Sequence, residues 1–377
     1  MDHVLAEAPC LLYETFAMMS RYFNERPYRE TADILLERYG GVLSDADRAA
    51  LSRNADMLDR ITNELCADLD RGEPEIAFFF KPFDTGRRGE VNCIGRVLLF
   101  SLMSTLIPDF DEHIADIKAR HEKAVADGAR VVDFNAAGVY WSTSAEGPCP
   151  SLFEQIYALH YPAEAKLNTF RVLSDFDRFI DRLAELMRPY AQRLSERLPE
   201  LLPAYGEAAR AWRDRVEENG LVYFAQLLHL TEPAFDRAGS LDINVGIFLF
   251  NEVGFGNSPS PDRLSLVLII GIGVYPGFER GYNERRAEKL AEVFRLLADP
   301  AKLDLLSRLA KQRSYCLELS KQTGVNAGNV SRSLNALFDS GLLEKQRVGG
   351  RTYYTTNEKA LKKAFIDAEL LISDPEI

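Results

Sequence analysis

Apolar side chains recur every three or four positions through the first seventy residues, which is the spacing of amphipathic helices. The first stripe comprises Leu12, Phe16, Met19 and Phe23. A second stripe comprises Leu51, Leu58, Ile61, Leu65 and Leu69. Ser44, with Asp47 three residues later, resembles a capping box and marks the start of the second stripe. Residues 11–70 are therefore predicted to be helical.

The pattern changes between residues 75 and 150. The short aromatic stretch EIAFFFKPF (75–83), bounded by Pro, predicts a strand. Residues 91–107 are almost continuously apolar and predict a buried helix. The charged stretch that follows, 109–127, predicts an exposed helix that ends near Gly128. Residues 131–150 are expected to mix extended and turn structure.

A long helical pattern returns over 151–219. Pro189, Pro199 and Pro203 interrupt it, and proline removes a helical N–H donor and clashes with the preceding turn. We therefore expect the prolines to break or kink this region into shorter segments.

Two β-branched runs follow, SLDINVGIFLF (240–250) and RLSLVLIIGIGVYP (263–276). With the loop 251–262 between them, they predict a hairpin or a strand pair. Pro276 and Gly277 are expected to close this first domain. The glycines of GIGVYPG (271–277) precede no helix N-terminus, so we interpret them as strand and turn residues rather than a phosphate loop.

From residue 284 the chain predicts a compact series of helices. ERRAEKLAEVFRLLAD (284–299) forms the first, and Asp299 with Pro300 restarts the chain as cap and first helical residue. SYCLELSKQTG (314–324) predicts a third helix, ending at Gly324. Asn326 is then a suitable N-cap for a fourth.

The fourth helix has two chemically different faces. Val330, Leu334 and Leu337 fall at i, i+4 and i+7 and define its buried face. The residues expected to point outward are Asn329, Ser331, Arg332 and Asn335. Amide and guanidinium groups match base edges in a DNA groove, and hydroxyls match phosphates.

A basic hairpin follows this helix. LLEKQRVGGRTYYTT (342–356) alternates as two strands joined by Gly349-Gly350, a pair that tight hairpin turns favour. A positive hairpin beside a helix-turn-helix is a wing. The predicted DNA-contacting residues are Asn326, Asn329, Ser331, Arg332, Asn335, Lys345, Arg347, Arg351 and Tyr353.

Charge supports the same division of the chain. The whole chain of 377 residues has a net charge of −12, but residues 284–377 carry 16 Lys and Arg against 13 Asp and Glu. Phosphates repel the acidic remainder, so DNA contact is confined to the basic end. We predict an α+β fold, mainly α, with a helical or mixed domain over 1–280 and a winged helix-turn-helix domain over 284–377.

The stretches FRLLADPAKLDLLSRL and GVNAGNVSRSLNALFDSGLLEKQRVGGRTYYT resemble the ArsR-type winged helix of bacterial transcriptional repressors. The resemblance covers about a quarter of the chain. It implies a homodimer built through the first and last helices of the module, the last one over 358–372. Many members sense metals through paired cysteines, but those positions hold Tyr315 and Leu317 here, with Cys316 between them. The usual histidine of the recognition helix is Ser333.

The first 283 residues contain no catalytic motif, and we expect neither an enzyme nor a cofactor. Their acid-rich stretch from Asp109 to His121 includes His113 and Asp116, a conceivable metal pair, but a solvated charged helix explains it equally. His160 and His229, beside aromatic and leucine side chains, suggest partly buried histidines. The five scattered cysteines favour free thiols. Aromatic clusters such as IAFFFKPF would line an apolar pocket or an ordinary core.

The sequence thus predicts a cytoplasmic, dimeric, DNA-binding regulator, in particular a repressor, that binds double-stranded DNA. Its N-terminal domain is expected to sense a small-molecule effector or a partner. No signal peptide is expected, because the N-terminus lacks a basic region and carries acidic residues early. No membrane span is expected, because the longest apolar run is shorter than the ~20 residues that a spanning helix needs. The alternatives are an enzyme or a protein-interaction scaffold recruited to DNA by the winged helix, or a winged helix that binds only protein.

Overall fold

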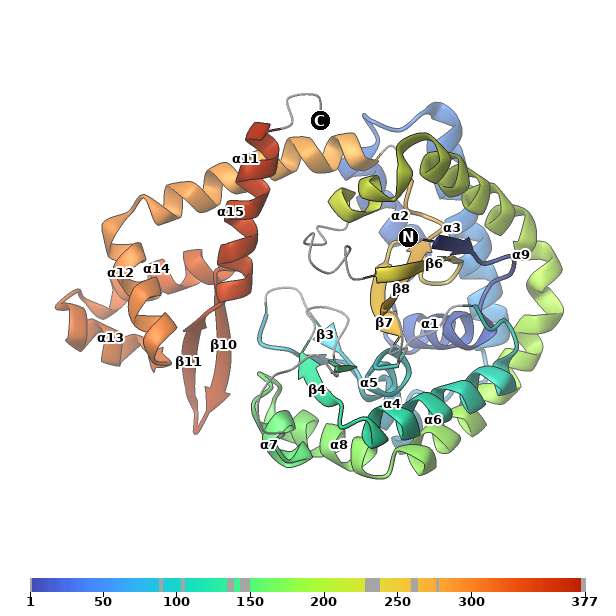
Figure 1. The fold of residues 1–377 in the computed structure, drawn as a ribbon, viewed down its shortest axis with the longest axis horizontal. Coiled ribbons are helices and arrows are strands. Elements are labelled where there is room, and N and C mark those ends of the chain that lie inside the picture. Colours follow the sequence, from blue (N-terminus) through green and yellow to red (C-terminus); the bar gives the residue numbers. More distant parts are fainter. Residues whose placement is uncertain are drawn as a thin grey trace. The chain divides into compact units, whose positions relative to one another are not determined.

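The computed structural model describes residues 2–87, 91–102, 106–133, 139–142, 150–227, 238–258, 264–275 and 278–373. The chain divides into two compact units. The first comprises Met1–Pro82, Asn92–Tyr157 and Leu167–Glu279. The second combines Phe83–Val91 and Ala158–Lys166 with Arg280–Ile377. Helices predominate over a few strands, which confirms the predicted α+β class (Figure 1).

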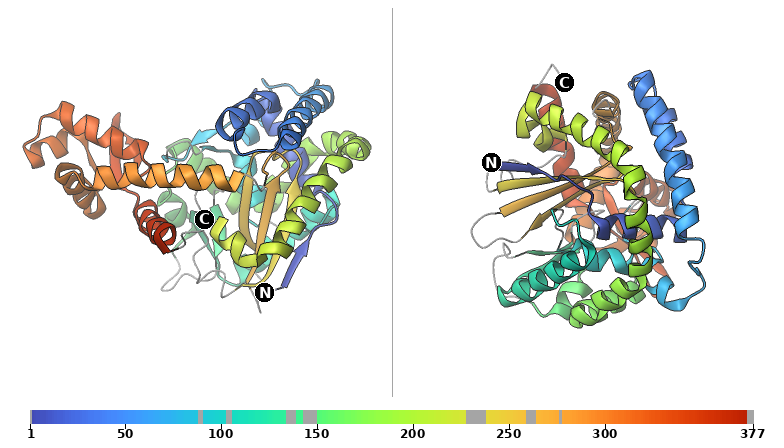
Figure 2. Two further views of the ribbon diagram at one scale, coloured as in Figure 1. Left: turned by 90° about the horizontal axis from the view of Figure 1, so that it is seen from above. Right: turned by 90° about the vertical axis from the view of Figure 1, so that its right-hand side faces the viewer.

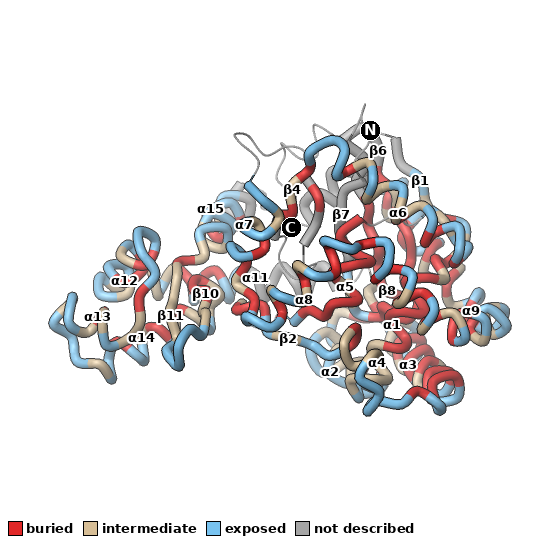
Figure 3. Tube along the Cα trace, turned by 90° about the horizontal axis from the view of Figure 1, so that it is seen from below, coloured by how far each residue is buried: buried red, intermediate tan, exposed pale blue. Residues whose placement is uncertain are grey.

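The predicted N-terminal helices are present as three elements. These are α1 (Leu11–Phe23), α2 (Tyr28–Tyr39) and α3 (Asp45–Leu65). Ser44 caps α3 as predicted, because its hydroxyl accepts the Asp47 N–H at 3.1 Å. Helix α1 is buried along most of its length (Figure 3), which explains its apolar residues.

Residues 74–80 form a helix, α4 (Pro74–Phe80), and the strand predicted over 75–83 is wrong. Pro74 occupies the first helical turn, where its missing N–H has no intrahelical partner to lose. Ile76, Phe79 and Phe80 are buried at i, i+3 and i+4, which is helical rather than strand periodicity. Only Phe83–Asp84 is extended, as β2.

The helix expected over 91–107 is shorter than predicted. Strand β3 (Val91–Asn92) precedes α5 (Ile94–Phe100), and residues 103–105 lie outside the described chain. The charged helix is confirmed as α6 (Phe110–Ala126), and Gly128 follows it with a φ of 68°.

A small antiparallel pair, β4 (Arg130–Asp133) with β5 (Val139–Ser142), follows α6 and confirms extended structure there. Two short helices come next, α7 (Leu152–Tyr157) and α8 (Ala163–Ser174).

The three prolines do not divide the next helix. Helix α9 (Phe176–Leu227) runs through 52 residues and curves around the first unit (Figure 1), so the predicted break is wrong and a bend replaces it. An interior proline costs about 3 kcal/mol, whereas each large buried side chain contributes roughly 1.5–3 kcal/mol. The buried stripe of α9 includes Ile180, Leu183, Met187, Leu194, Leu201, Tyr205 and Trp212.

Four strands of the first unit form a larger sheet (Figure 2), in the order β1-β6-β8-β7. They are β1 (Asp2–Leu5), β6 (Ala238–Gly246), β7 (Val253–Ser258) and β8 (Leu264–Gly271). The two predicted strands do pair, because β6 lies beside β8, but the pairing is parallel and the hairpin alternative is therefore wrong. Strand β7, inside the supposed loop, pairs antiparallel with β8. Pro276 and Gly277 lie outside the described residues.

Burial explains why β8 lacks strand alternation. Residues 267–270 are all buried, so helices or loops cover both faces of the strand. Strands of parallel sheets covered on both sides read as continuous apolar runs. The apolar stretch 264–271 is therefore a central strand.

A buried carboxylate from α1 fixes the turn after β6. Glu14 accepts the N–H groups of Ile247 and Phe248 at 2.8 and 2.7 Å. Tyr28 donates its hydroxyl to the Phe248 carbonyl at 3.0 Å. The same turn holds Phe250 at a φ of 43°, a backbone conformation that non-glycine residues rarely adopt. Burial raises the pKa of the Glu14 carboxyl to about 7.

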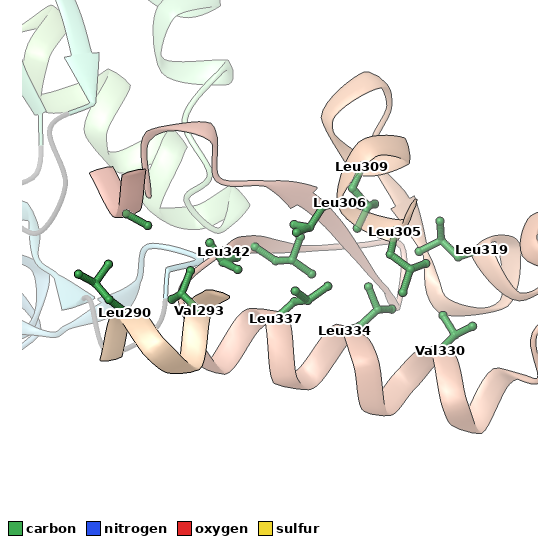
Figure 4. Close-up of a cluster of buried hydrophobic side chains, with 12 residues drawn as sticks. Leu290, Val293, Leu305, Leu306, Leu309, Leu319, Val330, Leu334, Leu337 and Leu342 are labelled. Atoms are coloured by element: carbon green, nitrogen blue, oxygen red, sulfur yellow. The ribbon is translucent and has the colours of Figure 1, made fainter. Parts of the chain in front are cut away.

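The second unit contains the predicted series of helices. They are α11 (Phe278–Leu297), α12 (Pro300–Lys311), α13 (Cys316–Thr323), α14 (Ala327–Asp339) and α15 (Glu358–Ser373). Asp299 caps α12, with Pro300 first in the helix, as predicted. Figure 4 shows side chains from α11, α12 and α14 meeting in one apolar core, with Leu305, Leu334 and Leu337 at its centre.

Three strands near the C-terminal end of this unit form a sheet in the order β10-β11-β9. They are β9 (Ser314–Tyr315), β10 (Leu343–Val348) and β11 (Arg351–Thr356). The third helix was predicted to begin at Ser314, but α13 begins at Cys316 because Ser314 and Tyr315 pair with β11. None of the helices in the described part of the chain has the length and apolar character needed to span a bilayer.

Two glycine substitutions test the packing of the first unit. A methyl group at Gly271 would lie 2.1 Å from the Phe250 carbonyl oxygen, whereas one at Gly206, inside α9, meets nothing within 4 Å. We expect Gly271→Ala to lower the free energy of unfolding by at least about 2 kcal/mol. Gly206→Ala should raise it by about 0.5–1 kcal/mol, because alanine restricts the unfolded chain. Urea unfolding of the full chain measures both; equal effects would contradict this packing.

Stability should also depend on pH through Glu14. Its pKa of about 7 in the folded chain exceeds its ordinary value of 4.5, so the folded state holds the proton more tightly. Stability therefore falls as pH rises from about 4.5 to above 7, by about 3 kcal/mol in total. Glu14→Gln should lack this loss, whereas Glu37→Gln, at an exposed site, should keep it. Urea midpoints from pH 4.5 to 8 measure the difference; parallel curves for all three proteins would rule it out.

Candidate nucleic-acid interface

A helix-turn-helix lies at the centre of the second unit. Helix α13 ends at Gly324, whose φ of 72° is the left-handed conformation common after helices. The Ser320 hydroxyl donates to the Val325 carbonyl at 2.6 Å and closes the turn. Asn326 then caps α14, since its side-chain oxygen accepts the Asn329 N–H at 2.9 Å. The predicted cap is confirmed, and it fixes where α14 begins.

Helix α14 has the two faces that the sequence predicted. Val330, Leu334 and Leu337 are buried, and Figure 4 shows them pointing into the apolar core. The predicted outward residues are all exposed: Asn329, Ser331, Arg332 and Asn335. The Arg332 guanidinium donates to the Asn329 side-chain oxygen, so the two groups lie side by side on the open face. Contact between these side chains and DNA bases stays a prediction.

The wing, residues 343–356, is a hairpin with a two-residue turn. Gly349 and Gly350 have φ values of 55° and 76°, and Val348 pairs with Arg351 across the turn. Positive φ at both central residues matches the turn to the twist of the strands. The tight turn predicted from the glycine pair is confirmed. Arg347 and Arg351 are exposed at the tip.

Aromatic rings support the cations of the wing sheet. The Arg351 guanidinium lies 5.0 Å from the centre of the Tyr315 ring, and the Lys345 ammonium lies 4.3 Å from that of Phe338. Tyr315 also contacts Tyr353 edge to face at 5.4 Å. Tyr353 is half-buried, so its ring packs within the sheet, and positive charge comes from Lys345 and Arg351.

Sequence reasoning missed two further cations beside this sheet. Arg313 lies 5.5 Å from the Tyr353 ring and donates to the Gln346 side chain at 3.2 Å. The sequence feature that could have identified Arg313 is its position within the basic stretch 311–351. Burial, and then the charge of Arg313, lower the pKa of Lys166, which belongs to the segment Ala158–Lys166 of the same unit. Nothing local in the sequence places Lys166 there.

The thiol of α13 makes a structural contact. Cys316 donates to the Ala327 carbonyl at 3.3 Å, and burial raises the pKa of its thiol. The thiol is therefore less available as a thiolate ligand. Within the described residues, no group of three or more His, Cys, Asp or Glu side chains is placed to hold a metal ion.

The predicted histidine environments differ. His113 is fully buried, its Nδ1 lies 3.0 Å from the Cys10 sulfur, and burial lowers its pKa to about 4. Asp116, suggested as its metal-binding partner, pairs instead with Arg120 at 2.6 Å. His160 contacts Glu344 in the second unit. His229 lies outside the described residues.

Residues 299–345 match the family model described as "Bacterial regulatory protein, arsR family". Curated relatives match the same region. A "Transcriptional repressor SmtB homolog" of Synechocystis sp. is 37% identical over 70 residues, which is 19% of this chain and 53% of the relative. The "HTH-type transcriptional regulator KmtR" of Mycobacterium tuberculosis is 33% identical over 79 residues, 21% of this chain and 61% of the relative.

A "Biofilm growth-associated repressor" of Xylella fastidiosa is 29% identical over 83 residues, 22% of this chain and 73% of the relative. The chain thus spans between about half and two thirds of the length of the first two relatives. No solved structure matches the chain. The C-terminal region carries an ArsR-family helix-turn-helix domain, and the relatives of this domain are transcriptional regulators.

The two exposed arginines should affect DNA binding differently. Arg332→Ala, on α14, should weaken binding by about 1–3 kcal/mol and relax sequence preference at one position. Arg351→Ala, at the wing, should weaken binding to all sequences and reduce the salt slope by about 1. Gel-shift titration at several salt concentrations measures both. Arg178→Ala, at an exposed site on α9, is the matched control; unchanged affinity in both test variants would exclude this surface.

Proposed function

We propose that this chain is a dimeric DNA-binding transcriptional regulator, in particular a repressor, in which the N-terminal region senses a small molecule or a partner. The proposal proceeds from the ArsR-family helix-turn-helix domain of the C-terminal region. The observation that carries it is the exposed polar face of α14 beside a basic wing. Arg332, Arg347 and Arg351 are all exposed there, and the Arg332 guanidinium donates to the neutral side chain of Asn329.

Charge distribution supports a DNA partner for this end alone. Residues 311–351 contain 7 Lys and Arg against 3 Asp and Glu. Residues 1–283 contain 29 against 44. The phosphates of duplex DNA attract residues 311–351 and repel residues 1–283. The acidic region therefore limits non-specific contacts between DNA and the rest of the protein.

Exposed apolar side chains on α15 support a dimer. Phe365 is 55% exposed and Ile366 is 41% exposed, although both are large and apolar. Phe365 packs edge to face on Phe294 of α11 at 5.7 Å, so the two terminal helices of the module share one surface. A second copy of this surface would cover these side chains.

A pocket in the first unit supports sensing of a small molecule. It has a volume of about 280 Å³ and is lined by residues of α1, α2 and α3, among them Arg21 and Tyr28, and by Arg71 from the turn between α3 and α4. The Arg21 guanidinium lies 4.4 Å from the Tyr28 ring centre. A small anionic molecule would match the arginines and the aromatic wall.

The salt dependence of DNA binding tests the proposal. Each phosphate contact contributes about −0.9 to the slope of log K against log salt. The slope should be about −5 if a dimer makes phosphate contacts through Lys345, Arg347 and Arg351 of both protomers. A monomer would give about half of that slope. Genomic fragments selected by the purified protein are titrated by fluorescence anisotropy from about 50 to about 200 mM salt. Footprints should show two half-sites about 34–36 Å apart or a multiple of that. Absence of salt-sensitive binding to any fragment would overturn the proposal.

A further inference from the structure

The base of the wing is held by two segments that precede residue 280 and belong to the second unit. We propose that Gly86, Arg87 and His160 form a clamp on Glu344 and Lys345 that positions the wing for DNA. We call these five residues the wing clamp. The inference rests on the proposed function, since it assigns positioning residues to the same DNA-binding surface.

The first part of the wing clamp is a buried polar network around one carboxylate. Glu344 on β10 is 6% exposed. Its two carboxylate oxygens contact Arg87 Nε at 2.8 Å and His160 Nδ1 at 3.0 Å. A buried carboxylate without such partners is strongly unfavourable. The Arg87 guanidinium, whose side chain is 9% exposed, is therefore committed to Glu344 rather than to phosphate.

The second part is a backbone contact that requires glycine. The Lys345 N–H donates to the Gly86 carbonyl at 3.0 Å. Gly86 has a φ of 82°, and a methyl group on it would lie 2.6 Å from the Lys345 carbonyl oxygen. Glycine alone combines this φ with so close an approach to a neighbouring backbone. Any side chain here would push β10 away.

The two clamping segments also hold each other. The rings of Phe83 and Tyr161 lie 4.9 Å apart, and Tyr161 is 1% exposed. The Gly86 N–H donates to the Asp84 carboxylate at 2.7 Å, which closes a turn just before Arg87. The segments thus present Gly86, Arg87 and His160 to β10 as one preorganised surface.

The wing clamp acts on the strand that carries the predicted phosphate contacts. Side chains two residues apart on a strand share a face, so Lys345 and Arg347 point to one side and Glu344 to the other. Fixing Glu344 and the Lys345 backbone therefore sets the direction of both cations. Residues 83–87 lie between α4 and α5, and residues 158–161 lie between α7 and α8.

The first test compares two glycine substitutions in the full-length chain. Gly86→Ala should expose the Lys345 amide to hydrogen exchange and weaken binding to the selected fragment by about tenfold or more, with a smaller salt slope. Gly128→Ala is the matched control, because Gly128 also has positive φ but has nothing within 4 Å of the added methyl group. It should leave both the exchange of the Lys345 amide and DNA affinity unchanged.

A double-mutant cycle separates positioning from direct DNA contact and serves also if Gly86→Ala does not fold. Arg87→Met and Glu344→Gln should each weaken binding, and the double variant should be no weaker than either single one. Additive losses, with Arg87→Met reducing the salt slope in both backgrounds, would show that Arg87 contacts phosphate and would overturn the proposal. Wild-type affinity in Gly86→Ala and in the cycle would overturn it as well. A wild-type chain that binds no fragment would instead overturn the proposed function.

Discussion

A negative charge inside a protein has to be compensated, and the buried carboxylate of Glu344 is compensated by Arg87 and His160. Neither partner comes from the last hundred residues that otherwise form the DNA-binding unit. The second unit is therefore assembled from three stretches of chain rather than one. Its wing strand depends on that assembly, since β10 is an edge strand whose Lys345 N–H is bound by Gly86. An uncovered edge of this kind invites pairing with other chains.

Glu14 solves the same problem differently in the first unit. Its partners are the backbone N–H groups of Ile247 and Phe248, so no arginine or histidine is needed in the core. Burial outweighs these hydrogen bonds and raises the pKa of the carboxyl to about 7. The carboxylate thereby holds a turn in which Phe250 adopts an unusual φ and Gly271 leaves room for its backbone. One buried acid shapes a local turn, and the other joins distant segments.

Features that depend on residues within four positions of each other were predictable from the sequence. The caps at Ser44, Asp299 and Asn326 and the glycine turn of the wing follow from local hydrogen bonding and backbone freedom. The two faces of α14 follow from helical spacing in the same way. The elements that form the candidate DNA surface, and the residues exposed on α14, could therefore be predicted from the sequence.

Features set by tertiary burial were not predictable in this way. The seven residues of α4 are too few for periodicity to separate helix from strand, and the buried stripe of α9 outweighs the penalty of its three prolines. The parallel pairing of β6 with β8 depends on the elements that cover both faces of the sheet. Strand β7 was not predicted because its glycines are typical of a loop. Likewise, no local pattern around Gly86 or His160 indicates its partner. These partners are Lys345 and Glu344, each more than 180 positions later in the chain.

The distance between Arg87 and Glu344 along the chain, 257 positions, also has a consequence for biosynthesis. Ribosomes add about 5–20 residues per second, so Arg87 is synthesised roughly ten to fifty seconds before Glu344 and the rest of β10. During that interval the nascent polypeptide carries Gly86 and Arg87 without their partners on β10. The wing clamp can therefore form only after β10 has been synthesised.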